Sequence, residues 1–406
     1  MNVLLVGSGG REHALAWKLA GSKLLDELHA APGNPGIAKL ATCHPVRIED
    51  AEALLGICRE NAVELVVVGP EGPLVAGVAD VLRAAGVAVF GPGAAAARIE
   101  GSKSFAKDVM RAAGVPTAAT LDLPHAQCVV KADGLAAGKG VWVCETQDDA
   151  RAAWVRAREL GGPVLVEELL EGEEVSVFAL CDGVNALALP AARDAKRLLD
   201  GDEGPNTGGM GAYSPVPDFS DEAAAELVEQ IHHPVLAELA RRRTPFIGLL
   251  YAGLMLTDDG PHVLEFNCRF GDPETQAILP RLDGDLLGAL AAAAAGRLDE
   301  ANAPIADRAA VTVVLAAPGY PEAPVSGQPI AGLERAEAAG ALVFQAGTAL
   351  RDGALVSAGG RVLNLTGVAP TVAEARSQAY EAAGLIEFPG AQLRRDIAGL
   401  AVHVPG

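Results

Sequence analysis

The sequence predicts an α/β protein of several domains that begins with a doubly wound sheet. At 406 residues the chain is too long for one hydrophobic core. Short apolar runs alternate with helical segments, and the first runs each end in a loop rich in glycine or proline. Half of the residues are hydrophobic and only 4% are aromatic, which is typical of a soluble globular protein.

Four short strands are predicted in the first hundred residues, at 3–6, 28–31, 65–68 and 87–90, with a helix over residues 14–19 after the first. Such strand–loop–helix units build a parallel sheet, and loops at the carboxyl ends of its strands are where ligands bind. We expect this first domain to close near residue 100.

A glycine-rich turn at residues 7–13 joins the first strand to the first helix. Backbone amides at a helix N-terminus can bind a phosphate. The dinucleotide fingerprint is not met, because Glu12 stands where its third glycine belongs. A small phosphate ligand, an NAD pocket and a purely structural turn all remain open.

A helix over residues 100–114 and a connector with Pro116 and Pro124 lead to a second, smaller unit at about 121–189. Strands at 128–131 and 141–144 form a hairpin around the loop 132–140. This loop leads into a strand and has one residue too few for a P-loop, but with Lys139 it can still fold over a triphosphate. A helix over 146–160 and strands at 164–170 and 173–180 follow. The acidic cluster at 167–174 is either a solvated surface or an interdomain linker that holds a nucleotide's base and ribose.

Further on, small residues surround Met210 in the stretch 206–213. They allow close approach of the backbone to a ligand, although a disordered loop is the alternative. A helix over 221–242 and a strand over 247–256 come next.

The stretch 263–276 is where we expect the chemistry to converge. Read as a strand, it places Glu265, Asn267 and Arg269 on one face. The opposite face then turns into the core and consists of Leu264, Phe266, Cys268 and Phe270. A carboxylate and an amide oxygen suit Mg2+, and a guanidinium suits a carboxylate or phosphate. The alternative is a half-exposed edge strand with a solvated polar face.

The formal charge of −20 and the pI near 4.8 argue against nucleic-acid or anionic-membrane binding. The six scattered cysteines indicate reduced thiols and not a zinc site or disulfide framework. We expect no signal peptide and no membrane span, and read the apolar run 289–295 as a buried helix. A cytoplasmic protein is expected. From about residue 325 a β-rich tail with a helix over 372–383 is assigned a packing role.

Six motifs together resemble the phosphoribosylamine–glycine ligase family (glycinamide ribonucleotide synthetase) of the ATP-grasp superfamily. They lie at residues 7–13, 31–36, 100–103, 131–140, 206–215 and 265–276. The match covers essentially the whole chain, and the last two motifs are the most specific. One departure stands out: Arg193 and Ala195 replace a glutamine and a histidine of the family.

The resemblance implies an ATP-grasp fold with an N-terminal Rossmann-like domain and a small β-rich C-terminal domain. The implied domains are 1–100 for substrate, 101–120 with 190–324 for the centre, 121–189 for the lid and 325–406 for the tail.

The resemblance also implies roles for particular residues. The ATP site comprises Lys103, Lys131, Gly138, Lys139, Gly140, Glu167, Glu168, Leu169, Leu170 and Glu174. The other substrates contact Gly9, Gly10, Arg11, Glu12, Asn34, Lys196, Gly208, Gly209 and Met210. Glu265 and Asn267 would bind Mg2+, with Mn2+ as the alternative, and Arg269 and Asp194 are the catalytic candidates.

The implied reaction joins glycine to 5-phosphoribosylamine through glycyl phosphate, with ATP as the phosphoryl donor, in purine biosynthesis. The partners would be these small molecules alone, with no nucleic acid and no membrane, and the protein a monomer or small homo-oligomer. Three alternatives are an NAD dehydrogenase, an ATP-grasp ligase for another acid and amine, and a non-catalytic nucleotide sensor.

Overall fold

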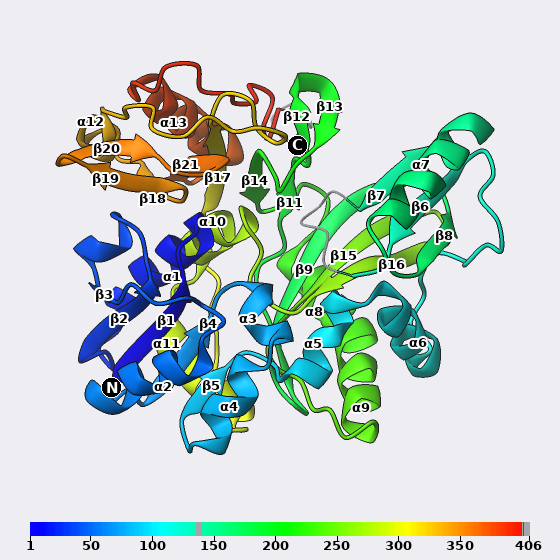
Figure 1. Ribbon diagram of the computed structural model, residues 1–406, viewed down its shortest axis with the longest axis horizontal. Coiled ribbons are helices and arrows are strands. Elements are labelled where there is room, and N and C mark those ends of the chain that lie inside the picture. Colours follow the sequence, from blue (N-terminus) through cyan, green and yellow to red (C-terminus); the bar gives the residue numbers. More distant parts are fainter. Residues whose placement is uncertain (135–139, 400, 402–406) are drawn as a thin grey trace.

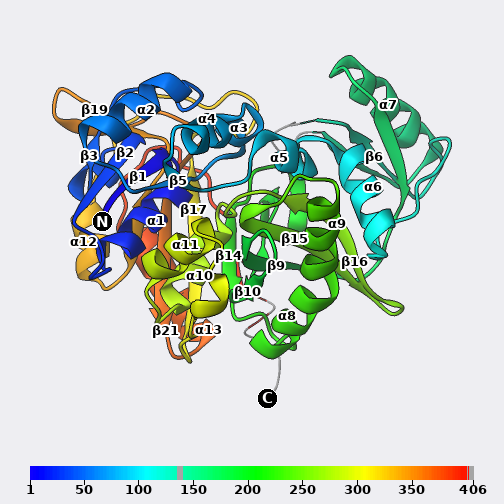
Figure 2. The ribbon, with the colours of Figure 1, turned by 90° about the horizontal axis from the view of Figure 1, so that it is seen from below.

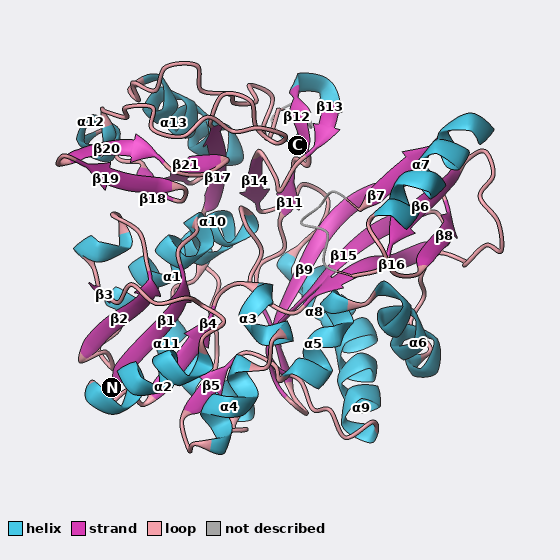
Figure 3. Ribbon diagram, viewed as in Figure 1, coloured by secondary structure: helices cyan, strands magenta, loops and turns pink. Residues whose placement is uncertain are grey.

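A computed structural model describes residues 1–134, 140–399 and 401, and the structural statements that follow concern these residues (Figure 1). The elements form four groups: an N-terminal sheet, a lid, a central sheet and a C-terminal sheet (Figure 3).

The N-terminal sheet has five parallel strands in the order β3-β2-β1-β4-β5. They are β1 Asn2–Gly7, β2 Glu27–Pro32, β3 Thr42–Cys43, β4 Leu65–Val68 and β5 Ala88–Phe90. The helices are α1 Gly10–Ala20, α2 Ala51–Glu60, α3 Glu71–Val75, α4 Val78–Ala84 and α5 Ala94–Gly101, with a 3-10 turn at Ile37–Lys39. Alternate residues of β1 enter two different cores, Leu4 with α2 and α4 and Leu5 with α1, so both faces are covered. The predicted doubly wound sheet is confirmed, and its strand order reverses between β1 and β4, the position where such sheets bind ligands.

The lid is a three-stranded antiparallel sheet in the order β7-β6-β8, with one helix packed on it. Its elements are β6 Cys128–Ala132, β7 Val141–Cys144, α7 Gln147–Glu159 and β8 Val164–Glu168, and α6 Lys103–Ala113 precedes it. The predicted hairpin and helix are confirmed. In Figure 1 the lid projects from the rest of the molecule beside the central sheet.

The central sheet is antiparallel, in the order β10-β9-β15-β16. The strands are β9 Glu173–Asp182, β10 Ala186–Ala188, β15 Ile247–Thr257 and β16 Gly260–Asn267. On one face lie α8 Asp221–Leu227, a π-helical turn Val228–His232 and α9 His233–Arg241 (Figure 2). The other face packs on α11 Leu286–Ala294, which also contacts the N-terminal sheet, so one buried helix joins both sheets.

The C-terminal sheet runs β11-β14-β17-β21-β18 and is antiparallel. Its strands are β11 Arg193–Asp194, β14 Gly211–Ser214, β17 Ala309–Ala316, β18 Leu342–Gln345 and β21 Arg361–Ala369. The helices around it are α10 Glu274–Ile278, α12 Leu333–Ala338 and α13 Val372–Gly384. Short 3-10 turns lie at Asp200–Asp202, Leu279–Arg281 and Leu298–Glu300. Two separate two-stranded ribbons are formed by β12 Arg197–Leu199 with β13 Glu203–Asn206 and by β19 Thr348–Arg351 with β20 Ala354–Ser357. The sheet therefore combines strands from near residue 200 with strands of the tail.

The local structure differs from the predictions in several places. Strand β16 ends at Asn267, so Arg269 follows the strand and does not share its face with Glu265 and Asn267 as predicted. The helix expected from residue 100 begins at Lys103, because Ser102 caps it and α5 ends just before. The helix over 221–242 contains the π-helical turn. Gly253 and Leu254 of β15 pair with Glu265 and Val263 of β16, so Leu264 is left as a bulge, and Val263 joins Phe266 in the core while Leu264 is only half buried. The prediction that Leu264 points into the core was wrong because of this bulge.

No helix among the described residues is long and apolar enough to cross a membrane.

Candidate active site

The end of β16 carries the acidic group around which the predicted site gathers. Burial alone would raise the pKa of Glu265, but the ammonium groups of Lys196, Lys131 and Lys103 hold it below its ordinary value. The folding thus brings three lysines from distant parts of the chain to the carboxylate that the sequence singled out. Asn267, two residues on, is 9% exposed. An ionised carboxylate beside an amide oxygen is a donor set that fits Mg2+.

Lys131 reaches this place from β6 and is held by a buried carboxylate. Its Nζ atom lies 2.6 Å from Glu167 Oε2 and donates to the Leu264 carbonyl at 3.1 Å. The other oxygen of Glu167 lies 3.0 Å from Nζ of Lys107, whose ammonium also donates to Thr117 Oγ1 at 3.0 Å. Glu167 therefore orients two lysines. Sequence reasoning missed Lys107, although its spacing of four from Lys103 places both on one face of α6.

Lys103 is fixed at the N-terminus of α6. Its backbone N–H donates to Asp133 Oδ1 at 2.5 Å, and its ammonium donates to the Gly134 carbonyl at 3.1 Å. Burial lowers the pKa of Lys103, with Glu265 opposing that shift. Gly138 and Lys139, predicted to contact ATP, lie outside the described residues. Gly140 is buried, and its carbonyl accepts from the Ala132 N–H at 2.8 Å.

The connection between lid and central sheet contains the predicted nucleotide-binding segment. Glu168 Oε1 accepts from the Ala119 N–H at 2.6 Å, which ties β8 to the connector before β6. Leu169 and Leu170 are half buried. Glu174, at the start of β9, lies 2.5 Å from Lys196 Nζ through its Oε2 atom. The structure therefore places this segment beside the lysine cluster.

Asp194 on β11 is the most strongly perturbed carboxyl of the site. Burial raises its pKa from 3.8 to about 7; Lys196 opposes this shift, and the carboxylates of Glu274, Glu174 and Glu265 reinforce it. Burial alone would lower the pKa of the Lys196 ammonium, but the carboxylates of Asp194, Glu174 and Glu265 keep it above its ordinary value. The pKa of Asp194 is raised and that of Glu265 is lowered. Carboxyl groups with opposite pKa shifts in one cluster are typical of a functional site.

Asp194→Asn is expected to change how stability depends on pH. The folded-state pKa is above the unfolded value, so between about pH 4 and pH 7 the unfolded chain releases a proton that the folded chain keeps. The parent should therefore lose stability across this window relative to the Asn variant, and the two should be alike near pH 4. Urea midpoints from pH 4 to pH 8 measure this. A constant difference over the window would contradict the assignment.

Arg269 is clamped between acidic residues of two helices. Its Nε atom lies 3.1 Å from Glu71 Oε2, and its Nη2 atom lies 3.0 Å from Glu100 Oε1 and 3.1 Å from Asn267 Oδ1. Glu100 also accepts from the Cys268 N–H at 2.8 Å. The guanidinium thus joins the end of β16 to α3 and α5. The sequence predicted Arg269 but neither of its two carboxylate partners.

The turn between β1 and α1 is filled by side chains. The Glu12 carboxylate accepts from the Gly9 N–H at 2.6 Å and lies 2.5 Å from Arg11 Nε. The Arg11 N–H donates to Asp272 Oδ2 at 3.3 Å, and its guanidinium donates to the Phe270 carbonyl at 2.9 Å. The amides of Gly9 and Arg11 therefore already donate to carboxylates, which does not favour a dinucleotide pyrophosphate at this turn.

Gly69→Ala is expected to destabilise the fold by about 1–3 kcal/mol, because it overpacks the buried Glu12. A Cβ atom on Gly69 would lie 2.1 Å from Glu12 Oε1 and 2.6 Å from its Cγ. Denaturant unfolding measures the loss. Gly56→Ala in α2 is the matched control, because a Cβ atom there meets nothing within 4 Å. Alanine is a better helix former than glycine, so this variant should raise the free energy of unfolding by roughly 0.5–1 kcal/mol. Equal stabilities for the two variants would contradict the packing argument.

The remaining predicted substrate residues lie on either side of this turn. Asn34 donates to the carbonyls of Ser8 and Gln345, both at 2.8 Å, so its side chain fastens β1 to β18. Met210 is fully buried in a small cluster with Leu198. The methionine side chain is therefore not available to a ligand, and the Met210 N–H and carbonyl are paired with Ala195 and Val314.

Three domain patterns match consecutive parts of the chain. The N domain of phosphoribosylglycinamide synthetase matches residues 1–100, its ATP-grasp (A) domain residues 101–275 and its C domain residues 310–399. The chain belongs to the phosphoribosylglycinamide synthetase family. The resemblance suggested by the motifs, and with it the ATP-grasp fold, is confirmed.

Members of this family resemble the chain over its full length. It is 51% identical to the phosphoribosylamine–glycine ligase of Mesorhizobium japonicum over 419 residues, with 99% of each chain covered. The identity to that of Streptomyces coelicolor is 51% over 418 residues, again with 99% of each covered. The crystal structure of the Thermotoga maritima phosphoribosylamine–glycine ligase superimposes with a TM-score of 0.84 at 37% identity and covers 98% of this chain and 100% of that one.

The ATP-grasp fold also relates the chain to more distant enzymes. The biotin carboxylase domain of Hydrogenobacter thermophilus 2-oxoglutarate carboxylase superimposes with a TM-score of 0.70 at 18% identity and covers 97% of this chain and 91% of that one. At this identity the likeness concerns the fold alone.

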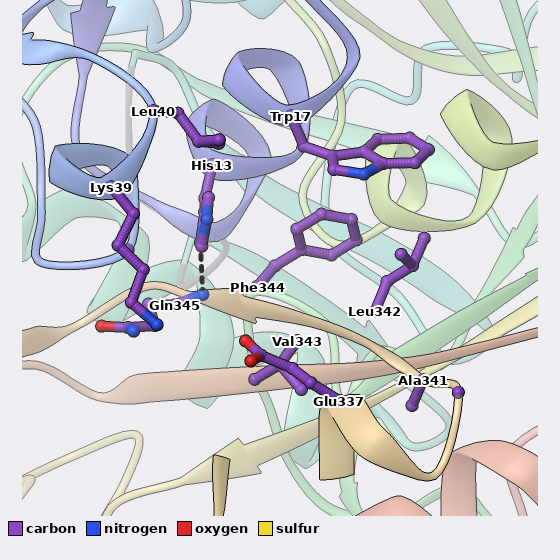
Figure 4. A pocket seen from close by; sticks show the side chains of 12 residues that line it. His13, Trp17, Lys39, Leu40, Glu337, Ala341, Leu342, Val343, Phe344 and Gln345 are labelled. Carbon is purple, nitrogen blue, oxygen red and sulfur yellow. Dashed lines mark hydrogen bonds between the residues drawn. The ribbon is translucent and has the colours of Figure 1, made fainter. Parts of the chain in front are cut away.

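A pocket of about 390 Å³ lies apart from this family site, between α1 and the tail (Figure 4). Trp17 and Phe344 form its aromatic wall, and Lys39 and Glu337 stand at its edge. His13 lines it and accepts from the Gln345 N–H at 2.7 Å; burial lowers the pKa of this imidazole to about 4. None of the lysines around Glu265 lines it.

Proposed function

We propose that this chain catalyses the ATP-dependent ligation of glycine to 5-phosphoribosylamine, giving glycinamide ribonucleotide, ADP and phosphate. The observation that carries the proposal is the ionised Glu265 surrounded by Lys103, Lys131 and Lys196, with Asn267 alongside. A cluster of cations beside a carboxylate matches a triphosphate and its metal ion. Membership of the family supports glycine as the acid and 5-phosphoribosylamine as the amine.

ATP would lie between the lid and the central sheet. Lys103 and Lys131 would neutralise its phosphates, and Gly138, Lys139 and Gly140 belong to the loop proposed to cover them. The base and ribose would be held along the segment that contains Glu167, Glu168, Leu169, Leu170 and Glu174. Because Glu167 already orients Lys107 and Lys131, we assign it a positioning role toward the phosphates.

Glu265 and Asn267 are proposed to hold Mg2+, with Mn2+ as an alternative because it accepts the same oxygen ligands. The bound ion would supply charge neutralisation at the phosphate oxygens.

The glycine carboxylate would attack the γ-phosphorus, which gives glycyl phosphate and releases ADP. The amine of phosphoribosylamine would then attack the acyl carbon and expel phosphate. No protein nucleophile is needed, so the chain contributes position and electrostatics. Arg269 would stabilise the negative charge of the acyl phosphate, and Asp194 with Lys196 would lie beside the glycine.

The phosphoribosyl group is proposed to lie over the turn of Gly9, Gly10, Arg11 and Glu12, near Asn34, with the backbone of Gly208–Met210 opposite. We assign the turn to this group as a whole and not to its phosphate alone. The reason is that carboxylates already accept from the amides of Gly9 and Arg11. A cytoplasmic location is part of the proposal, supported by six free cysteines.

The test is ADP release in the presence of ATP, Mg2+, glycine and freshly generated phosphoribosylamine, with each omitted in turn. Turnover should require all four. ADP release with a different acid and amine, and none with this pair, would keep the fold and overturn the substrate assignment. Hydride transfer with NAD would support the dehydrogenase alternative, although the Gly9 amide already donates to Glu12.

A further inference from the structure

An arginine of the tail reaches into the region assigned to the substrates. Arg361 is the first residue of β21, and 20% of its side chain is exposed. Its guanidinium donates through Nη1 to the carbonyls of Gly208, Gly209 and Asp272, the last two at 3.3 and 2.6 Å. Its Nη2 atom lies 3.4 Å from Asp272 Oδ1. One side chain therefore contacts two loops that are more than sixty residues apart in sequence.

The loop around Gly208 is packed directly on this guanidinium. A Cβ atom on Gly208 would lie 3.0 Å from Arg361 Cζ, so any larger residue there would make the guanidinium shift by a few tenths of an ångström. On the other side of the peptide, the Gly208 N–H donates to Tyr320 Oη at 2.9 Å. Both polar backbone groups of Gly208 are thus bound by side chains that follow β17 in the chain.

Asp272 extends the connection to the first turn of α1. Its Oδ2 atom accepts from the Arg11 N–H at 3.3 Å, and its Oδ1 atom accepts from Gln276 Nε2 at 2.9 Å. Burial alone would raise the pKa of Asp272, but Arg361 and Arg11 hold it below its ordinary value, so the carboxylate is ionised. Arg361, Asp272 and the α1 turn form one continuous polar chain.

We infer that Arg361 is a positioning residue for the half of the site that takes glycine and the phosphoribosyl group. The kinetic part of this inference rests on the proposed function. A planar guanidinium with several donors holds three carbonyls and a carboxylate in fixed relative positions, which a single ammonium cannot do. The tail would thereby shape the substrate pocket without contacting the nucleotide, because the lysines proposed to bind the nucleotide lie on other elements.

The kinetic test compares Arg361→Ala and Arg361→Lys with the parent. We expect KM for glycine to rise by about tenfold or more in both, while KM for ATP stays within about twofold, because small misplacements of bound reactants are costly. Free guanidinium should restore part of the activity of the Ala variant. Arg351→Ala is the matched control, since this arginine of the same tail is exposed on β19. Equal rises in both KM values, or none, would overturn the inference.

A second measurement does not depend on the identity of the substrates. Amide hydrogen exchange in peptides that cover residues 206–211 and 271–276 should become faster in Arg361→Ala and remain unchanged in Arg351→Ala. Faster exchange in Arg361→Ala, together with a parent protein that does not turn over glycine, would refute the proposed function while supporting the positioning role. Unchanged exchange would refute the positioning role whatever the turnover shows.

Discussion

Replacing Glu265 by glutamine is expected to reduce kcat/KM by about a thousandfold, the scale on which one preorganised electrostatic group contributes to catalysis. The substitution preserves shape but removes the charge around which Lys103, Lys131 and Lys196 gather. It also removes the proposed metal ligand. Both losses weaken binding of the charged phosphoryl group in the transition state, so the effect should appear in kcat as well as in KM.

Steady-state kinetics over a range of Mg2+ concentrations measure this effect, and half-maximal activity should need more metal. Glu171→Gln is the matched control, because Glu171 is exposed in the loop between β8 and β9. Denaturant unfolding of both variants separates catalysis from folding. A Glu265→Gln enzyme within about tenfold of the parent, with an unchanged Mg2+ requirement, would contradict the assigned role.

Arg269→Met is expected to lower the free energy of unfolding by about 3–5 kcal/mol at neutral pH, because it leaves buried carboxylates without their cation. The Glu100 side chain is only 9% exposed, and burial already raises its pKa even with Arg269 beside it. Burial alone would raise the pKa of Glu71 as well, but the charges of Arg269 and Arg11 outweigh burial and hold this pKa below its ordinary value. Protonation relieves an unpaired carboxylate, so the deficit should shrink as the pH falls toward 5.

Urea unfolding at several pH values tests this expectation. The double variant Arg269→Met with Glu100→Gln should recover part of the loss, because it removes one of the stranded charges. Arg111→Met serves as the control, since that arginine is 71% exposed in its ion pair with Asp108. A loss no greater than that of the control would show that the clamp does not stabilise the junction of β16 with α3 and α5.

The fold was largely predictable because its signals are local. Apolar runs that end in glycine loops gave the parallel sheet, and period-two alternation placed Glu265 and Asn267 together. What escaped prediction depends on pairing between distant segments. The bulge that turns Leu264 out of the core arises from the register with β15, and the mixed strand order of the C-terminal sheet leaves no mark within a short window.

The candidate site shows the same division. Charged residues inside recognisable motifs, such as Lys131 and Arg269, could be predicted from sequence as site residues, and their roles stay predictions. The pairing of Arg269 with Glu71 was not predicted, although the loop of Glu71 lies at the carboxyl end of a strand, where ligands were expected. The contacts of Arg361 were not predicted either, because the tail was assigned a packing role. Their significance comes from burial and from contacts across more than eighty residues of chain, as between Arg361 and Asp272.

The strand order of the C-terminal sheet limits how the chain can be divided. Strand β14 pairs on one side with the two-residue β11 and on the other with β17, which in turn pairs with β21. A polypeptide that stopped before Ala309 would leave the backbone groups of β14 exposed along an open edge, which favours intermolecular strand pairing. Proteolytic removal of everything from Ala309 onward should therefore yield an aggregating fragment and not a smaller enzyme.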